Sequence, residues 1–103
     1  MELNERVAII TGSSSGVGAA LAQQLAARGV KVVVNYSRSE AGARETLAAI
    51  ADVGGDGVMV QGDVSQQADC ERIVQTAIDS FGRLDILVNN AGTTTFVPHQ
   101  ELD

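Results

Sequence analysis

Small residues crowd the stretch TGSSSGVG at positions 11–18, directly after an apolar run. Backbone N–H groups in such a loop, together with the positive end of a following helix dipole, bind anions such as phosphate. In this role Gly12 permits a tight turn, Gly16 lets a phosphate approach the backbone, and Gly18 lets the helix lie close to its sheet. The serines add hydroxyls and backbone donors without bulk. The candidate binding residues are therefore Gly12, Ser13, Ser14, Ser15, Gly16, Val17 and Gly18.

Two other polar stretches follow apolar runs further along the chain. Asp63 and Val64 come after GVMVQG, and the motif NNAG, which contains Asn90, Ala91 and Gly92, comes after LDILV. The Asp63 carboxylate can accept a hydrogen bond from a ligand, or it can cap a following helix. NNAG can border a ligand site, or it can form a turn whose Asn side chains bond to their own backbone. The glycine spacing also leaves open a flexible strand-to-helix turn, because it is not the commoner dinucleotide fingerprint.

Short β-branched runs and longer helical periods alternate along the chain. The runs predict strands at 7–10, 30–36, 57–64 and 84–88. Apolar residues recur at three and four positions in the segments between them, which predicts helices that end at Gly29, at Gly54 and Gly55, and at Gly82. Ser37 and Glu40 have the spacing of a capping box for the second helix, and Ser65 is placed to cap the third.

This alternation is typical of a parallel sheet with helical crossovers, so we expect an α/β, Rossmann-type fold with helices on both faces and about four strands. We treat residues 1–103 as one nucleotide-binding domain, incomplete relative to larger folds of this class. The carboxyl ends of parallel strands meet at one edge of the sheet, where ligands of such folds bind. The three polar stretches would line that crevice.

Composition excludes several other classes of protein. The formal net charge is −6, with 13 acidic and 7 basic residues and no basic cluster, which argues against nucleic-acid and membrane partners. Cys70 is the only cysteine, so the chain has no disulfide or metal-binding cysteine pair, and we interpret it as a small helix residue. His99 is interpreted as a solvated loop residue. Neither a membrane span nor a signal peptide is evident, so we expect a cytoplasmic location.

Taken together, the motifs resemble the amino-terminal half of the short-chain dehydrogenase/reductase family, with ketoacyl reductases and related sugar and alcohol dehydrogenases nearest in style. The family pattern T-G-x-x-x-G-x-G is met by Thr11 with the three loop glycines, and the Asp-apolar and N-N-A-G motifs are met in full. The resemblance implies that Asp63 accepts a hydrogen bond from the adenine amino group and that Val64 contacts the ring. It also implies that the segment 90–92 borders the adenosine ribose and stabilises the sheet.

The cofactor implied by this resemblance is NADP rather than NAD. Members of the family that prefer NAD usually have an acid at the end of the second strand, which binds the ribose 2′-hydroxyl. Here that position is Tyr36, followed by Ser37 and Arg38, and no carboxylate is present to repel a 2′-phosphate. Arg38 can donate charge-assisted hydrogen bonds to the phosphate. The alternative is that Arg38 is a solvated residue of the helix start.

The catalytic residues implied by the family are missing from this chain. The only tyrosine and lysine are Tyr36 and Lys31, so no Tyr-x-x-x-Lys pair exists, and we assign no catalytic or metal-binding residue. We expect the cofactor-binding part of a longer, homo-oligomeric oxidoreductase that acts on a small-molecule carbonyl or alcohol. Two alternatives stay open: a non-catalytic nucleotide-binding module, and an interaction protein that pairs through the open edge of its fourth strand.

Overall fold

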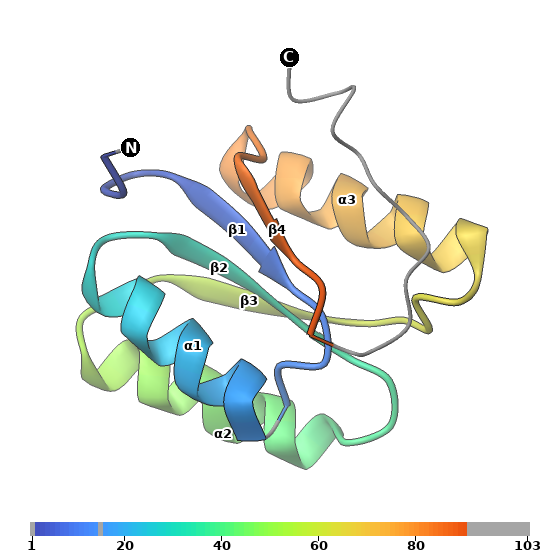
Figure 1. Cartoon of the computed structure of the whole chain (residues 1–103), viewed down its shortest axis with the longest axis horizontal. Helices are drawn as coiled ribbons and strands as arrows, with labels where there is room; N and C mark the ends of the chain where they lie inside the picture. Colours follow the sequence, from blue (N-terminus) through green and yellow to red (C-terminus); the bar gives the residue numbers. More distant parts are fainter. Residues whose placement is uncertain (1, 15, 91–103) are drawn as a thin grey trace.

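Four strands and three helices alternate along the part of the chain that the structure, a computed structural model, describes: residues 2–14 and 16–90. All the strands pair in parallel in one sheet of order β3-β2-β1-β4 (Figure 1), which confirms the predicted α/β, Rossmann-type fold. The strands are β1 (Val7–Ile10), β2 (Lys31–Tyr36), β3 (Gly57–Gln61) and β4 (Ile86–Val88). The helices are α1 (Gly16–Ala27), α2 (Glu40–Asp52) and α3 (Gln67–Phe81).

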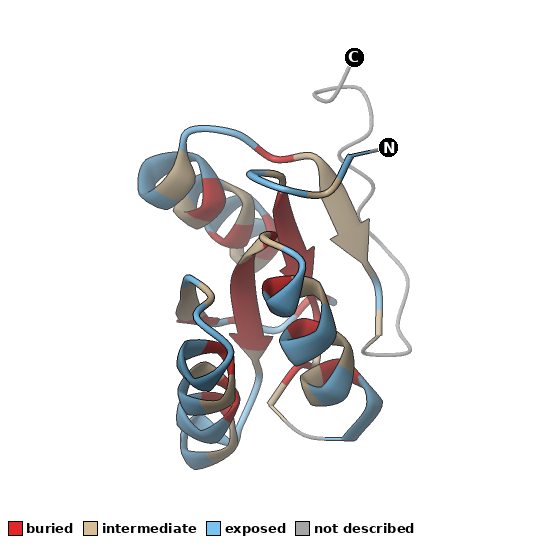
Figure 2. Cartoon of the chain, turned by 90° about the vertical axis from the view of Figure 1, so that its left-hand side faces the viewer, coloured by how far each residue is buried: buried red, intermediate tan, exposed pale blue. Residues whose placement is uncertain are grey.

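Helices cover both faces of the sheet, as the alternation of elements predicts. α1 and α2 pack on one face, against side chains such as Ile10 and Val32, and α3 packs on the other, against Ile9 and Val33 (Figure 1). The two central strands are therefore almost entirely buried, whereas the helices are buried on one side only (Figure 2). Burial of these aliphatic side chains is the main source of stability for the sheet.

The strand order reverses beside β1. The chain runs outward from β1 through β2 to β3, and α3 then returns it to the other side of β1, where β4 pairs. In open parallel sheets, ligands bind beyond the carboxyl ends of the strands at such a switch point. The fold therefore places a crevice where the loops after β1 and β4 diverge.

The predicted helix ends at Gly29 and Gly82 are confirmed by positive φ values of 90° and 81°. Both predicted N-caps are wrong. Ser39, rather than Ser37, caps α2, because its hydroxyl accepts a hydrogen bond from the Gly42 N–H at 3.0 Å. Ser65 lies one residue before Gln66, the α3 N-cap, and its hydroxyl and N–H donate to the Asp63 carboxylate.

At the amino ends of the strands, Asp85 ties β4 to β1. Its carboxylate accepts hydrogen bonds from the Val7 N–H at 2.9 Å and from Arg83 and Arg6 at 2.8 Å and 3.3 Å. Donation from Arg83, followed by that from Val7 and Arg6, lowers the pKa of this carboxyl. This end of the molecule is held by charge-assisted contacts and lies opposite the predicted binding crevice.

Two expectations concern the surface of the molecule. β4 lies at the edge of the sheet formed by the described residues, as predicted, and its three side chains are half-buried. Over the same part of the chain, no helix combines the length and apolar character needed to cross a membrane.

Candidate functional site

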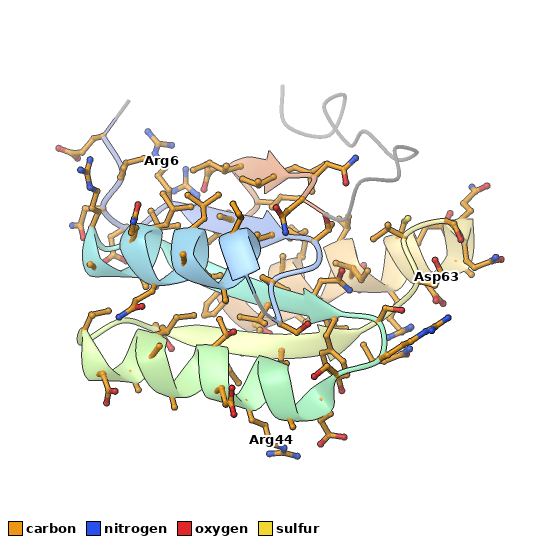
Figure 3. All side chains as sticks on the ribbon, turned by 60° about the horizontal axis from the view of Figure 1, so that its bottom comes forward. Arg6, Arg44 and Asp63 are labelled. Carbon is orange, nitrogen blue, oxygen red and sulfur yellow. The ribbon has the colours of Figure 1, made fainter. Side chains whose placement is uncertain are left out.

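The predicted binding residues gather at the carboxyl ends of the strands. The glycine-rich loop follows β1, Ser37 and Arg38 follow β2, Asp63 follows β3, and Asn90 follows β4. Figure 3 shows Asp63 at the end of the sheet opposite Arg6, which precedes β1. Ser15, Ala91 and Gly92 lie outside the described residues, so their predicted roles stay predictions.

The peptide groups on both sides of Gly12 are held by one side chain from β2 and one from the segment after β4. Its N–H donates to Oδ1 of Asn35 at 3.3 Å, and its carbonyl accepts from Nδ2 of Asn90 at 3.1 Å. A φ of 63° at Gly12 is left-handed, so the tight turn predicted here is present and favours glycine. Gly12 therefore shapes the loop, while its own N–H is already bonded within the protein.

Ser13 is fully buried and its polar groups are bonded inside the protein. Its hydroxyl donates to the Ile10 carbonyl at 2.7 Å and accepts from the Asn35 N–H at 3.1 Å. Its own N–H donates to the Asn35 carbonyl at 3.0 Å, and its carbonyl accepts from the Thr46 hydroxyl at 2.9 Å. The expectation that this hydroxyl is offered to a ligand is not met, because it bonds the backbone of β1 and β2, while the Ser13 carbonyl bonds α2.

The second half of the loop is open. Gly16 begins α1 with a φ of 61°, and a Cβ at this position would meet no atom within 4 Å. The first turn of a helix has N–H groups without partners in the helix, so the backbone at Gly16 and Val17 can donate to an anion. The Val17 side chain is 76% exposed. The donors that could bind an anion therefore lie at the start of α1, beyond positions 12 and 13, whose groups are bonded within the protein.

Gly18 has a different role from the one expected. A Cβ here would lie 2.6 Å from the Gly12 carbonyl oxygen and 2.5 Å from Nδ2 of Asn90. The close approach is therefore between α1 and the preceding loop with the Asn90 side chain, and not between α1 and the face of the sheet. The absence of a side chain preserves the hydrogen bond between Asn90 and Gly12.

Asp63 presents one carboxylate oxygen and keeps the other occupied. Oδ1 accepts from the hydroxyl and the N–H of Ser65 at 2.7 Å and 2.9 Å, and the Asp63 N–H donates to Asp69 at 2.8 Å. The two donations from Ser65, with a smaller contribution from the Arg38 charge, lower the Asp63 pKa. Asp63 is therefore ionised at neutral pH, and Oδ2 has no hydrogen bond to another described residue. The alternative in which its side chain caps α3 is not what the structure shows.

Val64 lies behind Asp63 in the core. It is 6% exposed and packs in the cluster that contains Cys70 and Ile73, and its carbonyl accepts from the Cys70 thiol at 3.2 Å. Burial raises the pKa of that thiol, which fits the interpretation of Cys70 as a packed helix residue. Little of the Val64 side chain is left for a ligand ring to contact.

The segment after β2 is attached to β3 and carries an exposed cation. Gly62 donates its N–H to the Tyr36 carbonyl at 2.9 Å, and the Gln61 amide donates to the Ser37 carbonyl at 3.1 Å. Arg38 is exposed and forms no hydrogen bond or ion pair with another described residue. The basic side chain expected near a 2′-phosphate is therefore not held in an ion pair in this part of the chain, although its charge acts on Asp63.

Asn90 connects the end of β4 to the glycine loop. Its N–H donates to Oγ1 of Thr11 at 2.9 Å, in addition to the bond from its amide to Gly12, and the Thr11 hydroxyl donates to Oδ1 of Asn89 at 3.2 Å. Asn90 does not form the alternative predicted for NNAG, a turn in which the Asn side chains bond to their own backbone. These contacts fit the stabilising role that the resemblance implied for this motif.

Several residues that shape this site were not predicted from the sequence. Asn35 and Thr46 are buried and bind the glycine loop, Asp69 binds the backbone of Asp63, and a Cβ at Gly42 would lie 2.4 Å from the Ser14 carbonyl oxygen. A signal existed for Asn35, because it is polar within the otherwise apolar end of a central strand. Thr46 and Asp69 resemble ordinary helix residues, so their sequence neighbourhood gave no such signal.

An open parallel α/β sheet with a glycine-rich loop at its switch point defines a nucleotide-binding class of protein. Comparison with known proteins identifies the family within this class to which the chain belongs. The family model described as short chain dehydrogenase matches residues 6–103. The chain therefore belongs to the short-chain dehydrogenase family, whose members bind NAD or NADP, and the family predicted from the three motifs is confirmed.

Individual relatives agree with the family model. The chain is 45% identical over 92 residues to a 3-oxoacyl-acyl-carrier-protein reductase of Synechocystis, covering 89% of this chain and 37% of the relative. It is 40% identical over 103 residues to the short-chain dehydrogenase/reductase homolog YusS of Bacillus subtilis, covering 100% of this chain and 94% of the relative. A solved mutant of Serratia marcescens short-chain dehydrogenase/reductase superposes with a TM-score of 0.84 at 36% identity, covering 94% and 40% of the two chains.

The extent of these matches differs between relatives. The chain spans 37% to 41% of the length of three of the curated relatives that it matches.

Proposed function

We propose that the chain is the NADP-binding part of an oxidoreductase that interconverts a small-molecule carbonyl and an alcohol. The observation that carries this proposal is the open backbone at Gly16, where a helix begins at the switch point of the sheet. When bound, the nicotinamide of NADP supplies or accepts the hydride. The named activity of the Synechocystis relative, a 3-oxoacyl reductase, supports a carbonyl substrate.

The residues at this end of the sheet fit a dinucleotide. The N–H groups at Gly16 and Val17 would hold the pyrophosphate, and no atom lies within 4 Å of the position of a Cβ at Gly16. The free oxygen of Asp63 would accept a hydrogen bond from the adenine amino group, since that carboxylate is ionised. The segment from Asn90 to Gly92 would border the ribose.

The choice of NADP over NAD is supported by the segment after β2. Tyr36 stands where an acid would bind a 2′-hydroxyl, and Arg38 is exposed and forms no ion pair with another described residue. A guanidinium and the Ser37 hydroxyl can both donate to a 2′-phosphate. Titration with each cofactor tests this directly: we expect a lower dissociation constant for NADP, and tighter binding of NAD would contradict the proposal.

The described residues supply binding groups and no proton relay. Tyr36 and Lys31 are the only tyrosine and lysine of the sequence. Lys31 pairs with Glu5 at 3.2 Å and lies over the Phe81 ring, at the amino ends of the strands and away from the crevice. We therefore expect the general acid and base of carbonyl reduction to be residues other than the described ones. A homo-oligomeric state and a cytoplasmic location stay predictions, as does the treatment of residues 1–103 as one domain.

A second candidate is a nucleotide-binding module that performs no hydride transfer. It is favoured by the match to YusS, of which 94% is covered, because this relative has nearly the extent of the present chain. The mass of the protein in its source cells separates the two functions. A mass well above 10.7 kDa together with carbonyl reduction supports the first candidate. A mass of 10.7 kDa, with NADP binding but no reduction, supports the second.

A further inference from the structure

A buried amide bridges the two loops that would hold opposite parts of the dinucleotide. Asn35, the fifth residue of β2, is 2% exposed. Its Oδ1 accepts from the Gly12 N–H at 3.3 Å, and its Nδ2 donates to the Val60 and Gly62 carbonyls at 3.4 Å and 3.2 Å. One side of the amide therefore binds the glycine loop after β1, and the other binds the end of β3.

The amide is fully used by these contacts. A primary amide offers two N–H donors and one carbonyl acceptor group, and each of the three has a partner here. Burial of an amide is unfavourable unless its hydrogen bonds are made, and the neighbouring positions of β2 show that valine fits this strand. A polar side chain at this position is therefore explained by the bridge that it makes.

Two partners of the amide, Gly12 and Gly62, belong to the loops that carry proposed ligand contacts. Gly12 opens the loop that leads to Gly16, the proposed pyrophosphate contact, and Gly62 immediately precedes Asp63, the proposed adenine contact. We propose that Asn35 is a positioning residue that sets the pyrophosphate loop and the adenine loop at the spacing a dinucleotide requires. This inference rests on the proposed function, because it needs a ligand that spans both loops.

The side chain of Asn35 can be removed without removing the other attachment of the loop. The hydrogen bonds between Ser13 and Asn35 use the backbone N–H and carbonyl of Asn35, and the bond from Thr46 to Ser13 does not involve Asn35. Asn35→Ala therefore deletes only the bridge between the two loops. Val34→Ala is the matched control, since Val34 is the preceding residue of β2, is fully buried, and packs in the core without bonding either loop.

The experiment is a calorimetric titration of the whole chain with NADP, together with chemical denaturation of each variant. We expect Asn35→Ala to raise the dissociation constant by about tenfold to a hundredfold, the effect of losing buried hydrogen bonds. Val34→Ala should lower the unfolding midpoint and leave the dissociation constant within about twofold. An unchanged dissociation constant in Asn35→Ala would overturn the inference. Absence of binding by the wild-type chain would instead overturn the proposed function.

A second variant keeps the test decisive if Asn35→Ala does not fold. In Asn35→Asp a protonated acid retains one donor and one acceptor, whereas the ionised form loses the donor and repels the Val60 and Gly62 carbonyls. Burial raises the pKa of such a carboxyl. We expect NADP binding by the folded variant to weaken as the pH rises. The dissociation constant of the variant is divided by that of the wild type at the same pH, so that contributions from Asp63 and Asp69, which both proteins contain, cancel. A ratio of the two dissociation constants that is independent of pH would overturn the inference.

Discussion

Substitution of Gly16 separates a role in ligand binding from a role in backbone geometry. Gly16 has a φ of 61° and an open space where a Cβ would lie. Gly54 offers a matched control: its φ is 77°, its Cβ would also meet no atom within 4 Å, and it lies between α2 and β3, at the amino ends of the strands. Alanine at either position adds the same methyl group and the same backbone strain, but only Gly16 is in the proposed site.

The size of each effect follows from these surroundings. A left-handed conformation costs an alanine about 1–2 kcal/mol, and the smaller entropy of the unfolded variant returns about 0.4–1 kcal/mol. We therefore expect both variants to lose about 1 kcal/mol of unfolding free energy. A methyl group on Gly16 also prevents a phosphate from reaching the backbone N–H groups. Loss of one charge-assisted hydrogen bond weakens binding about tenfold to a hundredfold.

The assay combines urea denaturation with NADP titration of the wild type, Gly16→Ala and Gly54→Ala. We expect similar unfolding midpoints for the two variants and a raised dissociation constant for Gly16→Ala alone. Gly16→Val should abolish binding, since its side chain is larger and β-branched. Equal affinity of the two alanine variants for NADP would refute the assignment of Gly16 to the phosphate contact, whatever their stabilities.

Three further predictions concern specificity, pH and packing. Arg38→Ala should weaken NADP about tenfold and leave NAD nearly unchanged, because a charge-assisted hydrogen bond to the 2′-phosphate is lost; equal losses for both cofactors in a titration would contradict this. The pKa of Asp85 is lowered on folding, so its stabilisation is present above the ordinary pKa of 3.8 and is lost as the pH falls through the lower folded value. Asp85→Asn should therefore cost about 1 kcal/mol at pH 7 and flatten the loss of stability in acid, measured by denaturation from pH 7 to pH 3. Gly18→Ala should lower the unfolding midpoint by displacing Asn90 from Gly12, with a cost of about 1–3 kcal/mol for the forced contact. Gln24 is exposed on the same helix, so Gln24→Ala is the control and should leave the unfolding midpoint unchanged.

The alternation of strands and helices could be predicted because it is local. Runs such as VAII bury both faces of a strand, and glycines such as Gly29 and Gly82 end helices by adopting a left-handed backbone that other residues avoid. The alternation itself predicted the parallel sheet, and the polar stretches after three of its strands predicted the position of the crevice. These features depend on residue type and spacing along the chain.

Capping and the use of each hydroxyl could not be predicted in the same way. Ser37, Ser39 and Ser65 all have a side chain of the type that can cap a helix. The backbone of the connecting loops decides that only Ser39 does so. Ser65 does not cap α3 because the helix begins one residue later than a cap at Ser65 requires, with Gln66 as the N-cap. Ser13 was expected to serve a ligand, but the packing of β2 and α2 around it leaves its hydroxyl no access to solvent.

The sequence by itself determined the family, the order of the elements and the stretch of small residues at positions 11–18. The tertiary structure decided how that stretch divides into a part at Gly12 and Ser13 that is hydrogen-bonded within the protein and an open start of α1 at Gly16. This division depends on Asn35, Thr46 and Asn90, which are distant in sequence and reach the loop only after the sheet has formed. Hydrogen bonds between such distant residues leave no periodic pattern in a sequence, so only the folded chain shows them.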